Sequence, residues 1–228
     1  MRAAVLYSGG KDSSIALYKS YMNGYEISCL ITLVPEYDDS MLFHYPNVYY
    51  TYMQAEALDI PLIQEYIERS SKDKELDRLR TLLREAKNRY QLDVLVSGVL
   101  SSRYQYDRLN RVAYELGLEH IAPCWQEEQL YHMHEIVSNG IVAILTSVSA
   151  YGLTDDMLGK LIDHEMIERL YTLSRRHGFN VNFEGGEAET FVLDMPLFNK
   201  RIRVDDYTIH WDGIRGYMEF RSLLFNDK

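Results

Sequence analysis

Apolar residues in the first half of the chain gather into short runs, which are separated by longer stretches with helical spacing. Residues 3–7 form the first run, and residues 27–34 form a second one that is rich in β-branched and aliphatic side chains. Short runs of this kind predict buried strands. Three further strands are predicted: a short one that starts at Pro61, one at residues 93–97 and one at residues 118–122.

Helices are predicted between these strands. Residues 72–90 give the strongest pattern, because apolar side chains recur there every three or four positions. The pattern also predicts helices at residues 13–23, with Gly24 as the stop, at 50–58 and around 109–116. This alternation indicates an α/β fold with a parallel sheet that is covered by helices on both faces.

The rhythm changes after Trp125. The pattern then predicts helices at 129–138 and 163–176, a strand at 141–148, a turn rich in glycine and glutamate at 184–190, and short strands at 202–204 and 207–211. No linker rich in proline or serine separates the two halves. We therefore expect one domain at residues 1–127 and a smaller α+β domain at residues 128–228.

Charge and hydropathy exclude several classes of protein. The chain has 24 lysine and arginine residues against 34 aspartate and glutamate residues, which gives a net charge of −10. Extensive nucleic-acid binding normally needs clustered basic residues, so this balance argues against it. No apolar run reaches the length of a membrane span, and the N-terminus does not have the form of a signal peptide. These features predict a cytoplasmic protein with no membrane partner.

The two cysteines, Cys29 and Cys124, lie far apart in the sequence and form no CxxC pair. Neither a structural zinc site nor a redox pair is therefore indicated. Both are expected to be small, buried apolar residues.

The strongest candidate for chemistry is a hexapeptide that joins the first predicted strand to the first predicted helix. It reads Ser8-Gly9-Gly10-Lys11-Asp12-Ser13. The glycines let the backbone approach an anion closely, and the start of a helix presents N–H groups and the positive end of its dipole. The serine hydroxyls and the lysine add further donors. The loop would thus hold a polyphosphate, and an ordinary strand-to-helix turn is the structural alternative.

This hexapeptide matches neither the Walker A pattern nor GxGxxG. It resembles the SGGxDS loop of the N-type ATP pyrophosphatases, also called PP-loop enzymes. The resemblance implies that the loop holds the β,γ-pyrophosphate of ATP and that the products are AMP and pyrophosphate. Asp12 either caps the following helix or holds Mg²⁺, and capping is the favoured interpretation.

A second candidate group follows the predicted strand that ends at Gly98. Its members, at the start of the next helix, are Ser102, Tyr104, Gln105 and Arg108. They would face a nucleotide, and Arg108 would balance charge on a phosphate in the transition state. The alternative is that Arg103, Arg108 and Arg111 form the solvated side of an amphipathic helix, and periodicity alone favours that alternative.

A third group surrounds a pair of glycines late in the chain. Its members are Glu184, Gly185, Gly186, Glu187, Glu189 and Thr190. Crowded carboxylates serve to bind a metal or a cationic ligand, or to carry out acid–base work. A solvated acidic loop is the alternative that composition favours. The apolar residues 191–193 indicate that the loop is anchored to the core.

Five segments together resemble the diphthine–ammonia ligase family, the diphthamide synthetases of the PP-loop superfamily. They are residues 8–13, residues 44–47 with 54–57, residues 98–125, residues 149–153 with 158–159, and the most specific one, residues 184–198. The chain departs from the family pattern at Phe183 and Asn110, where glycine and glutamate are expected, and at Ala188, where an aromatic residue is common. It lacks the extra C-terminal domains of longer eukaryotic members and resembles the short archaeal form.

The resemblance implies a Rossmann-like sheet of the HUP type and a two-step reaction. The carboxylate of diphthine on elongation factor 2 attacks the α-phosphorus of ATP, and pyrophosphate leaves. Ammonia, taken as ammonium from solution, then displaces AMP and forms the amide of diphthamide. ATP is the implied cofactor, and Mg²⁺ is inferred from ATP chemistry. The oligomeric state stays open, with a homodimer among the alternatives.

The resemblance also implies which residues act. Lys11, Asp12, Glu184, Glu187 and Glu189 would be catalytic, residues Ser8 to Ser13 with Ser102, Tyr104, Gln105 and Arg108 would bind ATP, and His44, Gly185, Gly186, Glu187, Glu189 and Thr190 would bind the substrate. Glu187 and Glu189 would attract ammonium and accept its proton, or hold the quaternary ammonium of diphthine. Glu184 would instead orient the loop. The sequence does not divide these roles among the three glutamates, and a lone histidine such as His44 is more often structural.

Two rival functions remain open on the sequence. A PP-loop enzyme that thiolates tRNA or forms lysidine would need a basic surface, and thiolation would also need reactive cysteines. A nucleotide-sensing module on the same fold would need only the first loop. Lys11, Asp12 and the glutamate group argue against that module.

Overall fold

The computed structural model describes residues 1–35, 47–67 and 72–228. The chain divides into two compact units, Met1–Trp125 and Gln126–Lys228. The first unit contains β1 (Arg2–Leu6), α1 (Lys11–Met22), β2 (Glu26–Pro35), η1 (Asn47–Tyr50), α2 (Thr51–Leu58), β3 (Leu62–Ile67), α3 (Lys72–Tyr90), β4 (Val94–Val96), α4 (Arg103–Glu115) and β5 (Glu119–Ile121). This order confirms the alternation of strands and helices that the apolar pattern predicts.

The strands of the first unit form one parallel sheet in the order β3-β2-β1-β4-β5. The chain builds outward from β1 through β2 to β3 and then continues on the other side with β4 and β5. Ligands of such sheets bind beyond the carboxyl ends of the strands at the point where the order reverses. Here that point lies between β1 and β4, whose carboxyl ends lead into the turns at Gly9 and Gly98.

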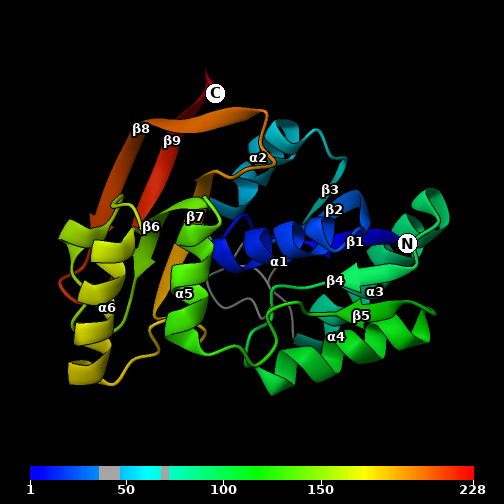
Figure 1. Ribbon diagram of the computed structural model, residues 1–228, viewed down its shortest axis with the longest axis horizontal. Coiled ribbons are helices and arrows are strands. Elements are labelled where there is room, and N and C mark those ends of the chain that lie inside the picture. Colours follow the sequence, from blue (N-terminus) through cyan, green and yellow to red (C-terminus); the bar gives the residue numbers. More distant parts are fainter. Residues whose placement is uncertain (36–46, 68–71) are drawn as a thin grey trace. The chain divides into compact units, whose positions relative to one another are not determined.

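Helices cover both faces of this sheet (Figure 1). On one face, Ala4 and Leu6 of β1 belong to a buried apolar cluster that also includes leucines and alanines of α3 and α4. Successive side chains of a strand point to opposite faces, so Ala3 and Val5 point to the other face, where both are fully buried. Helix α1 packs against β1, β2 and β4. The predicted α/β class is therefore confirmed.

Helix α1 ends as the sequence predicts. Gly24 follows the C-cap residue Asn23 and has a φ of +83°. The N–H of Gly24 donates to the carbonyl of Tyr21 at 2.9 Å, and that of Tyr25 donates to the carbonyl of Ser20 at 3.2 Å. This pair of bonds satisfies the last carbonyls of the helix and requires a left-handed residue at position 24.

The second unit combines two helices with an antiparallel sheet. Its elements are α5 (Gln129–Ser138), β6 (Val142–Val148), η2 (Asp155–Met157), α6 (His164–His177), β7 (Ala188–Asp194), β8 (Lys200–Trp211) and β9 (Gly216–Asp227). The strands lie in the order β7-β6-β9-β8, and each neighbouring pair is antiparallel. Helices α5 and α6 pack against each other. The expected α+β character of this part is confirmed.

Three details of the second unit differ from the predictions. The turn expected at 184–190 is shorter, because β7 already begins at Ala188 and places Glu189 and Thr190 on a strand. The two short strands expected at 202–204 and 207–211 are one strand, β8, whose register shifts between Val204 and Tyr207. Strand β9 was not predicted. In the ranges that the structure describes, no helix is long and apolar enough to cross a membrane.

Candidate functional site

Two glycines of the first unit lie so close to their neighbours that a Cβ at either position would clash. Gly9 has a φ of +79°, and a Cβ there would lie 2.3 Å from Oε1 of Gln54. Gly98 follows β4, and a Cβ there would lie 2.7 Å from the backbone of Asp12 and Ser13. The turn after β4 therefore packs directly on the first turn of α1. Both glycines are fixed by close approach of backbone to its neighbours.

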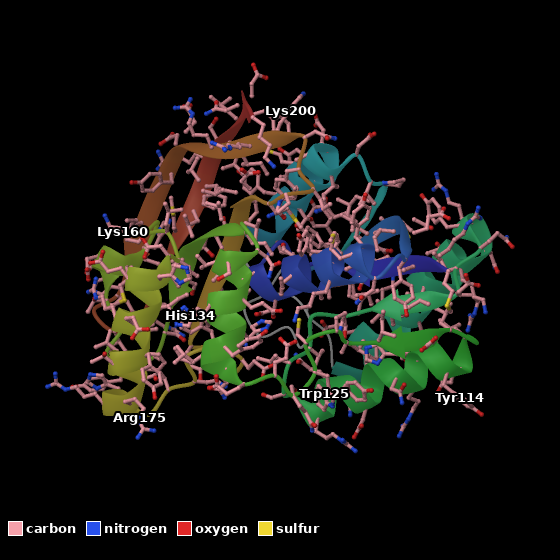
Figure 2. The ribbon with its side chains drawn as sticks, in the orientation of Figure 1. Tyr114, Trp125, His134, Lys160, Arg175 and Lys200 are labelled. Carbon is pink, nitrogen blue, oxygen red and sulfur yellow. The ribbon has the colours of Figure 1, made fainter. Side chains whose placement is uncertain are left out.

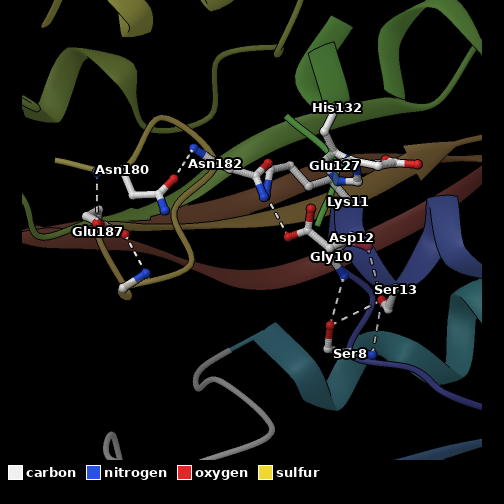
Figure 3. A network of polar contacts seen from close by, with 11 residues as sticks. Ser8, Gly10, Lys11, Asp12, Ser13, Glu127, His132, Asn180, Asn182 and Glu187 are labelled. Carbon is white, nitrogen blue, oxygen red and sulfur yellow. Dashed lines mark hydrogen bonds and ion pairs between the residues drawn. The ribbon is translucent and has the colours of Figure 1, made fainter. Parts of the chain in front are cut away.

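The loop between β1 and α1 holds its shape through its own serines (Figure 3). The hydroxyls of Ser8 and Ser13 lie 3.2 Å apart, and the N–H of Ser8 donates to the Ser13 hydroxyl at 3.3 Å. The Ser13 hydroxyl donates in turn to the carbonyl of Gly10 at 3.1 Å. The two serines that the sequence assigns to phosphate binding thus also order the backbone that would surround the phosphate.

Gln54 is a loop contact that the sequence reasoning missed. Its Nε2 donates to the carbonyl of Gly9 at 2.9 Å from the buried face of α2. The methyl of Thr51, one turn earlier, lies 3.0 Å from the position of a Cβ at Gly9. Gln54 belongs to a segment that carries the family resemblance, and that membership was the available signal in the sequence.

Asp12 does not cap α1, so the favoured interpretation of this residue was wrong. The N-cap residue of α1 is Gly10, which has no side chain to cap the helix, and Asp12 lies within the first turn. Asp12 instead accepts from Nζ of Lys11 at 2.7 Å. Lys11 is only 2% exposed, whereas the Asp12 side chain is 32% exposed. The start of α1 therefore keeps its positive dipole end without a side-chain cap.

The predicted group at the start of α4 divides into a structural and a surface part. Ser102 is the N-cap of α4, and its hydroxyl accepts from the N–H of Gln105 at 3.4 Å. The guanidinium of Arg108 lies 4.0 Å from the centre of the Tyr104 ring. Both Tyr104 and Arg108 line a cavity of about 480 Å³ between α3 and α4. Arg103 is exposed and pairs with Asp107, as expected of a solvated helix face.

A buried histidine lies in the middle of β5, beside β4. Nε2 of His120 and the hydroxyl of Ser97 are 2.9 Å apart, and Ser97 immediately precedes Gly98. The ring of Tyr106 lies against that of His120, with 5.1 Å between the ring centres. Tyr106 also stacks on Trp125, with 4.2 Å between the ring centres. Burial lowers the pKa of His120 to about 4, so the ring is neutral at physiological pH.

In the second unit, residues 178–187 connect α6 to β7, and we call this connection the glutamate loop. Glu187 holds this loop together (Figure 3). Its Oε1 accepts from the N–H of Asn180 at 3.0 Å, and its Oε2 accepts from the N–H of Gly185 at 2.8 Å. Its backbone carbonyl accepts from the N–H of Ser149 at 2.8 Å. Both carboxylate oxygens of Glu187 are therefore engaged with the backbone of its own loop.

Phe183 explains one departure from the family pattern in physical terms. Its φ is +68°, in the left-handed region that glycine adopts without strain. Phe183 is 6% exposed, so the burial of its ring offsets the strain. Ala188, at the second departure, is buried at the start of β7. Asn110, at the third, lies on the exposed side of α4.

The remaining predicted residues are placed as follows. Glu184 precedes the glycine pair, and Glu189 and Thr190 lie on β7, where they pair with Ser147 and Leu145 of β6. All three are partly exposed. His44 lies outside the described residues. Both cysteines are buried and neither forms a disulfide, and burial raises the pKa of Cys29 to about 12.

Comparisons with known proteins agree with the resemblance seen in the sequence. Residues 1–120 match the family model of the diphthamide synthase N-terminal domain, and residues 128–224 match that of the C-terminal domain. The diphthine–ammonia ligase of Danio rerio is 34% identical over 100% of this chain and 98% of its own length. The human one is also 34% identical, over 100% of this chain and 94% of its own length. The one from Schizosaccharomyces pombe is 35% identical over 98% of this chain, which spans 40% of that relative.

Proposed function

This chain belongs to the diphthamide synthase family, and from that membership we propose that it is a diphthine–ammonia ligase. In the proposed reaction, ATP activates the diphthine carboxylate of elongation factor 2 as an acyl-adenylate. Ammonia then displaces AMP and leaves the amide. The chemistry needs this order, because a carboxylate does not react with ammonia near neutral pH and adenylation supplies a leaving group.

The arrangement around residues 8–13 supports the ATP half of the proposal. This loop lies at the carboxyl end of β1, next to β4, where the strand order reverses. Helix α1 starts there without a side-chain cap. Because Gly9 and Gly98 have no side chain, neither position crowds the turns that follow β1 and β4. In this proposal the α1 N-terminus and Lys11 stabilise the charge of the departing pyrophosphate.

Mg²⁺ is part of the proposal for the ATP half. This ion is typically held by one or two carboxylates together with phosphate oxygens of the substrate. Asp12 offers a partly exposed carboxylate in the first turn of α1. The residues present therefore fit the ion, which would neutralise charge on the phosphates. Lys11, at 2.7 Å from Asp12, would hold that carboxylate in place.

The hydrogen bonds of Glu187 support a proposed division of roles among the three glutamates. We infer that Glu187 is a positioning residue, because both of its carboxylate oxygens accept backbone N–H groups of the loop. Attraction of ammonium and removal of its proton then fall to Glu189 or Glu184. Glu189 is partly exposed on β7, one residue beyond the loop, which suits a group that meets a substrate.

The decisive experiment incubates the protein with diphthine-bearing elongation factor 2, ATP, Mg²⁺ and ammonium. Mass spectrometry should show conversion of the acid to the amide, with AMP as the co-product. Formation of ADP in place of AMP would contradict cleavage at the α-phosphorus. AMP formation without amide would leave the loop assignment standing and remove the proposed acceptor.

A further inference from the structure

Two histidines of the second unit meet between neighbouring helices. His134 lies on α5 and His164 is the first residue of α6. Their Nδ1 atoms are 3.0 Å apart, and the rings are nearly parallel, at 25°, with centres 5.2 Å apart. Figure 2 labels His134 between the two helices. The proposed ligase reaction uses neither histidine.

A carboxylate on the far side of one ring determines which nitrogen carries its proton. Oε1 of Glu168 lies 3.4 Å from Nε2 of His134. Glu168 is four residues after His164 on α6, so both occupy the same face of that helix. The carboxylate favours the tautomer of His134 with its proton on Nε2, which turns the lone pair of Nδ1 toward His164. His164 then donates its Nδ1 proton to that lone pair.

This arrangement has the form of a metal site with a supporting carboxylate. Histidine ligands of metals usually donate their other ring N–H to a carboxylate, which fixes the tautomer and the ring orientation. Two nitrogens 3.0 Å apart, each about 2.1 Å from a shared ion, subtend an angle of about 90° at the ion. Tetrahedral ligands would be about 3.4 Å apart. The two rings now meet end to end, since their centres are 5.2 Å apart and their Nδ1 atoms 3.0 Å apart. The spacing suits neighbouring positions of a tetragonal or octahedral ion once both rings turn so that their Nδ1 lone pairs converge on it.

We propose that His134 and His164 form a binding site for one divalent transition-metal cation of the Ni²⁺ or Cu²⁺ class. The cation replaces the Nδ1 proton of His164, and a proton is held instead on Nε2 of the same ring, so the ring stays neutral. Both imidazoles bind in their neutral form through Nδ1, Glu168 holds His134 from behind, and water fills the remaining positions. His164 and Glu168 are exposed and His134 is partly exposed, which gives the ion a path from solvent.

Calorimetric titration of the untagged protein with Ni²⁺ tests this site. The wild-type protein should bind one ion saturably, and the ion should raise the unfolding temperature because it links α5 to α6. His134→Gln and His164→Gln should each abolish this binding. Glu168→Gln should keep the site and weaken it roughly 10-fold, which is the usual effect of losing a supporting carboxylate. Cu²⁺ bound to the wild type should show two nitrogen donors by electron paramagnetic resonance.

His210 provides the matched control. It is an exposed histidine of the same unit whose Nε2 lies 2.7 Å from Glu219, but its ring stacks on Tyr217 and not on a second imidazole. His210→Gln should therefore bind Ni²⁺ as the wild type does. The proposal is overturned if the wild type shows no saturable binding up to about millimolar Ni²⁺. It is equally overturned if both single variants of the pair bind with wild-type affinity, or if the Cu²⁺ spectrum shows no nitrogen donors.

Discussion

At the scale of single residues, backbone conformation decides several positions of the site. Gly9 and Gly24 have nearly the same φ, +79° and +83°. A Cβ at Gly9 would meet the side chains of Gln54 and Thr51, whereas a Cβ at Gly24 would have nothing within 4 Å. The two glycines therefore separate the cost of a left-handed backbone from the cost of crowding the phosphate loop.

Gly9→Ala should abolish AMP formation, because it pushes Gln54 away from the loop that the ATP phosphates would occupy. Gly24→Ala should lower the free energy of unfolding by about 1 kcal/mol and leave AMP formation unchanged. Denaturant unfolding and a pyrophosphate-release assay measure the two effects. Equal loss of activity in both variants would show that general strain, rather than the loop, is responsible.

Phe183 offers a second test of backbone strain. Phe183→Gly and Phe183→Ala should both be less stable than the wild type, by about 3 kcal/mol, because each loses a buried ring. The glycine variant should be the more stable of the two by about 0.5–1 kcal/mol, since φ is +68° at this position.

Phe191 is the control for this expected order, in which the glycine variant is more stable than the alanine variant. It is a buried residue on β7 without a positive φ. Phe191→Ala should be more stable than Phe191→Gly, which is the ordinary order in a strand. Urea midpoints of the four variants give the comparison. The same order at both positions would contradict a left-handed strain at Phe183.

Glu187 and Glu189 should respond differently to the same substitution. Glu187→Gln replaces one of the two carboxylate oxygens that accept backbone N–H groups with an amide NH₂ group. It should therefore lower both stability and the rate of amide formation at any ammonium concentration. Glu189→Gln should raise the KM for ammonium and change stability little. Steady-state kinetics with varied ammonium separate the cases. Full activity in both variants would remove the glutamate loop from the mechanism.

The residues of the site differ in how far the sequence could predict them. The loop at residues 8–13 is local, because a strand end, two glycines and a helix start follow one another in the chain. Asp12 was misjudged, because it lies inside the first turn of α1, after the N-cap residue Gly10, and pairs with Lys11. The contact of Gln54 with Gly9 joins residues 45 positions apart. Such contacts depend on how elements pack, and no local pattern encodes them.

At the scale of elements, the sequence predicted the helices and the parallel strands, whereas it did not predict the β8–β9 pair. Parallel strands buried on both faces give continuous apolar runs, which stand out in a sequence. In β9 the buried residues Met218 and Phe220 alternate with more exposed ones, and the next buried residue, Leu223, breaks that alternation. In β8 the register shifts beside Asp205 and Asp206, and the break in alternation divided one strand into two predictions. Half-exposed strands with a bulge carry a weaker signal.

Helix caps give a prediction at this scale. Asp163 caps α6 by accepting from the N–H of Met166 at 2.8 Å, whereas the bond from Gln105 to Ser102 at the start of α4 is 3.4 Å long. Asp163→Ala should therefore cost about 1–2 kcal/mol of unfolding free energy, and Ser102→Ala about 0.5 kcal/mol.

Ser102 is also a predicted ATP contact, so its variant has a second readout. If Ser102 only caps α4, the KM for ATP should stay within about twofold of the wild type, which corresponds to less than about 0.5 kcal/mol. A tenfold rise in that KM, with little loss of stability in urea, would show that Ser102 also contacts the nucleotide. Asp163→Ala, in the other unit, serves as the control for a pure cap.

At the scale of the whole molecule, the strand order of the sheet in the first unit is the feature that the sequence left open and the structure supplies. The order β3-β2-β1-β4-β5 makes β1 and β4 neighbours, and this brings Gly98 against the first turn of α1. The next pairing in this order, β4 with β5, places Ser97 beside His120 of β5. Burial at this junction couples the stability of the protein to pH.

His120 should make the protein less stable as the pH falls from 6.5 toward 4. Its pKa is lowered to about 4 in the folded protein by burial, against about 6.5 when unfolded. The unfolded chain therefore binds a proton first, so the full stability is present above pH 6.5 and is lost below it. The loss reaches about 2 kcal/mol at pH 5 and about 3 kcal/mol at pH 4. Urea unfolding between pH 7 and pH 4 measures it.

His120→Gln is the matched variant, because glutamine keeps a polar group beside Ser97 and does not titrate. Carboxylates contribute to the pH dependence of both proteins, so the relevant quantity is the difference between their free energies of unfolding at each pH. That difference should shift by about 2 kcal/mol in favour of the variant between pH 7 and pH 5. A constant difference over this range would mean that His120 takes up its proton in the folded protein as readily as in the unfolded chain.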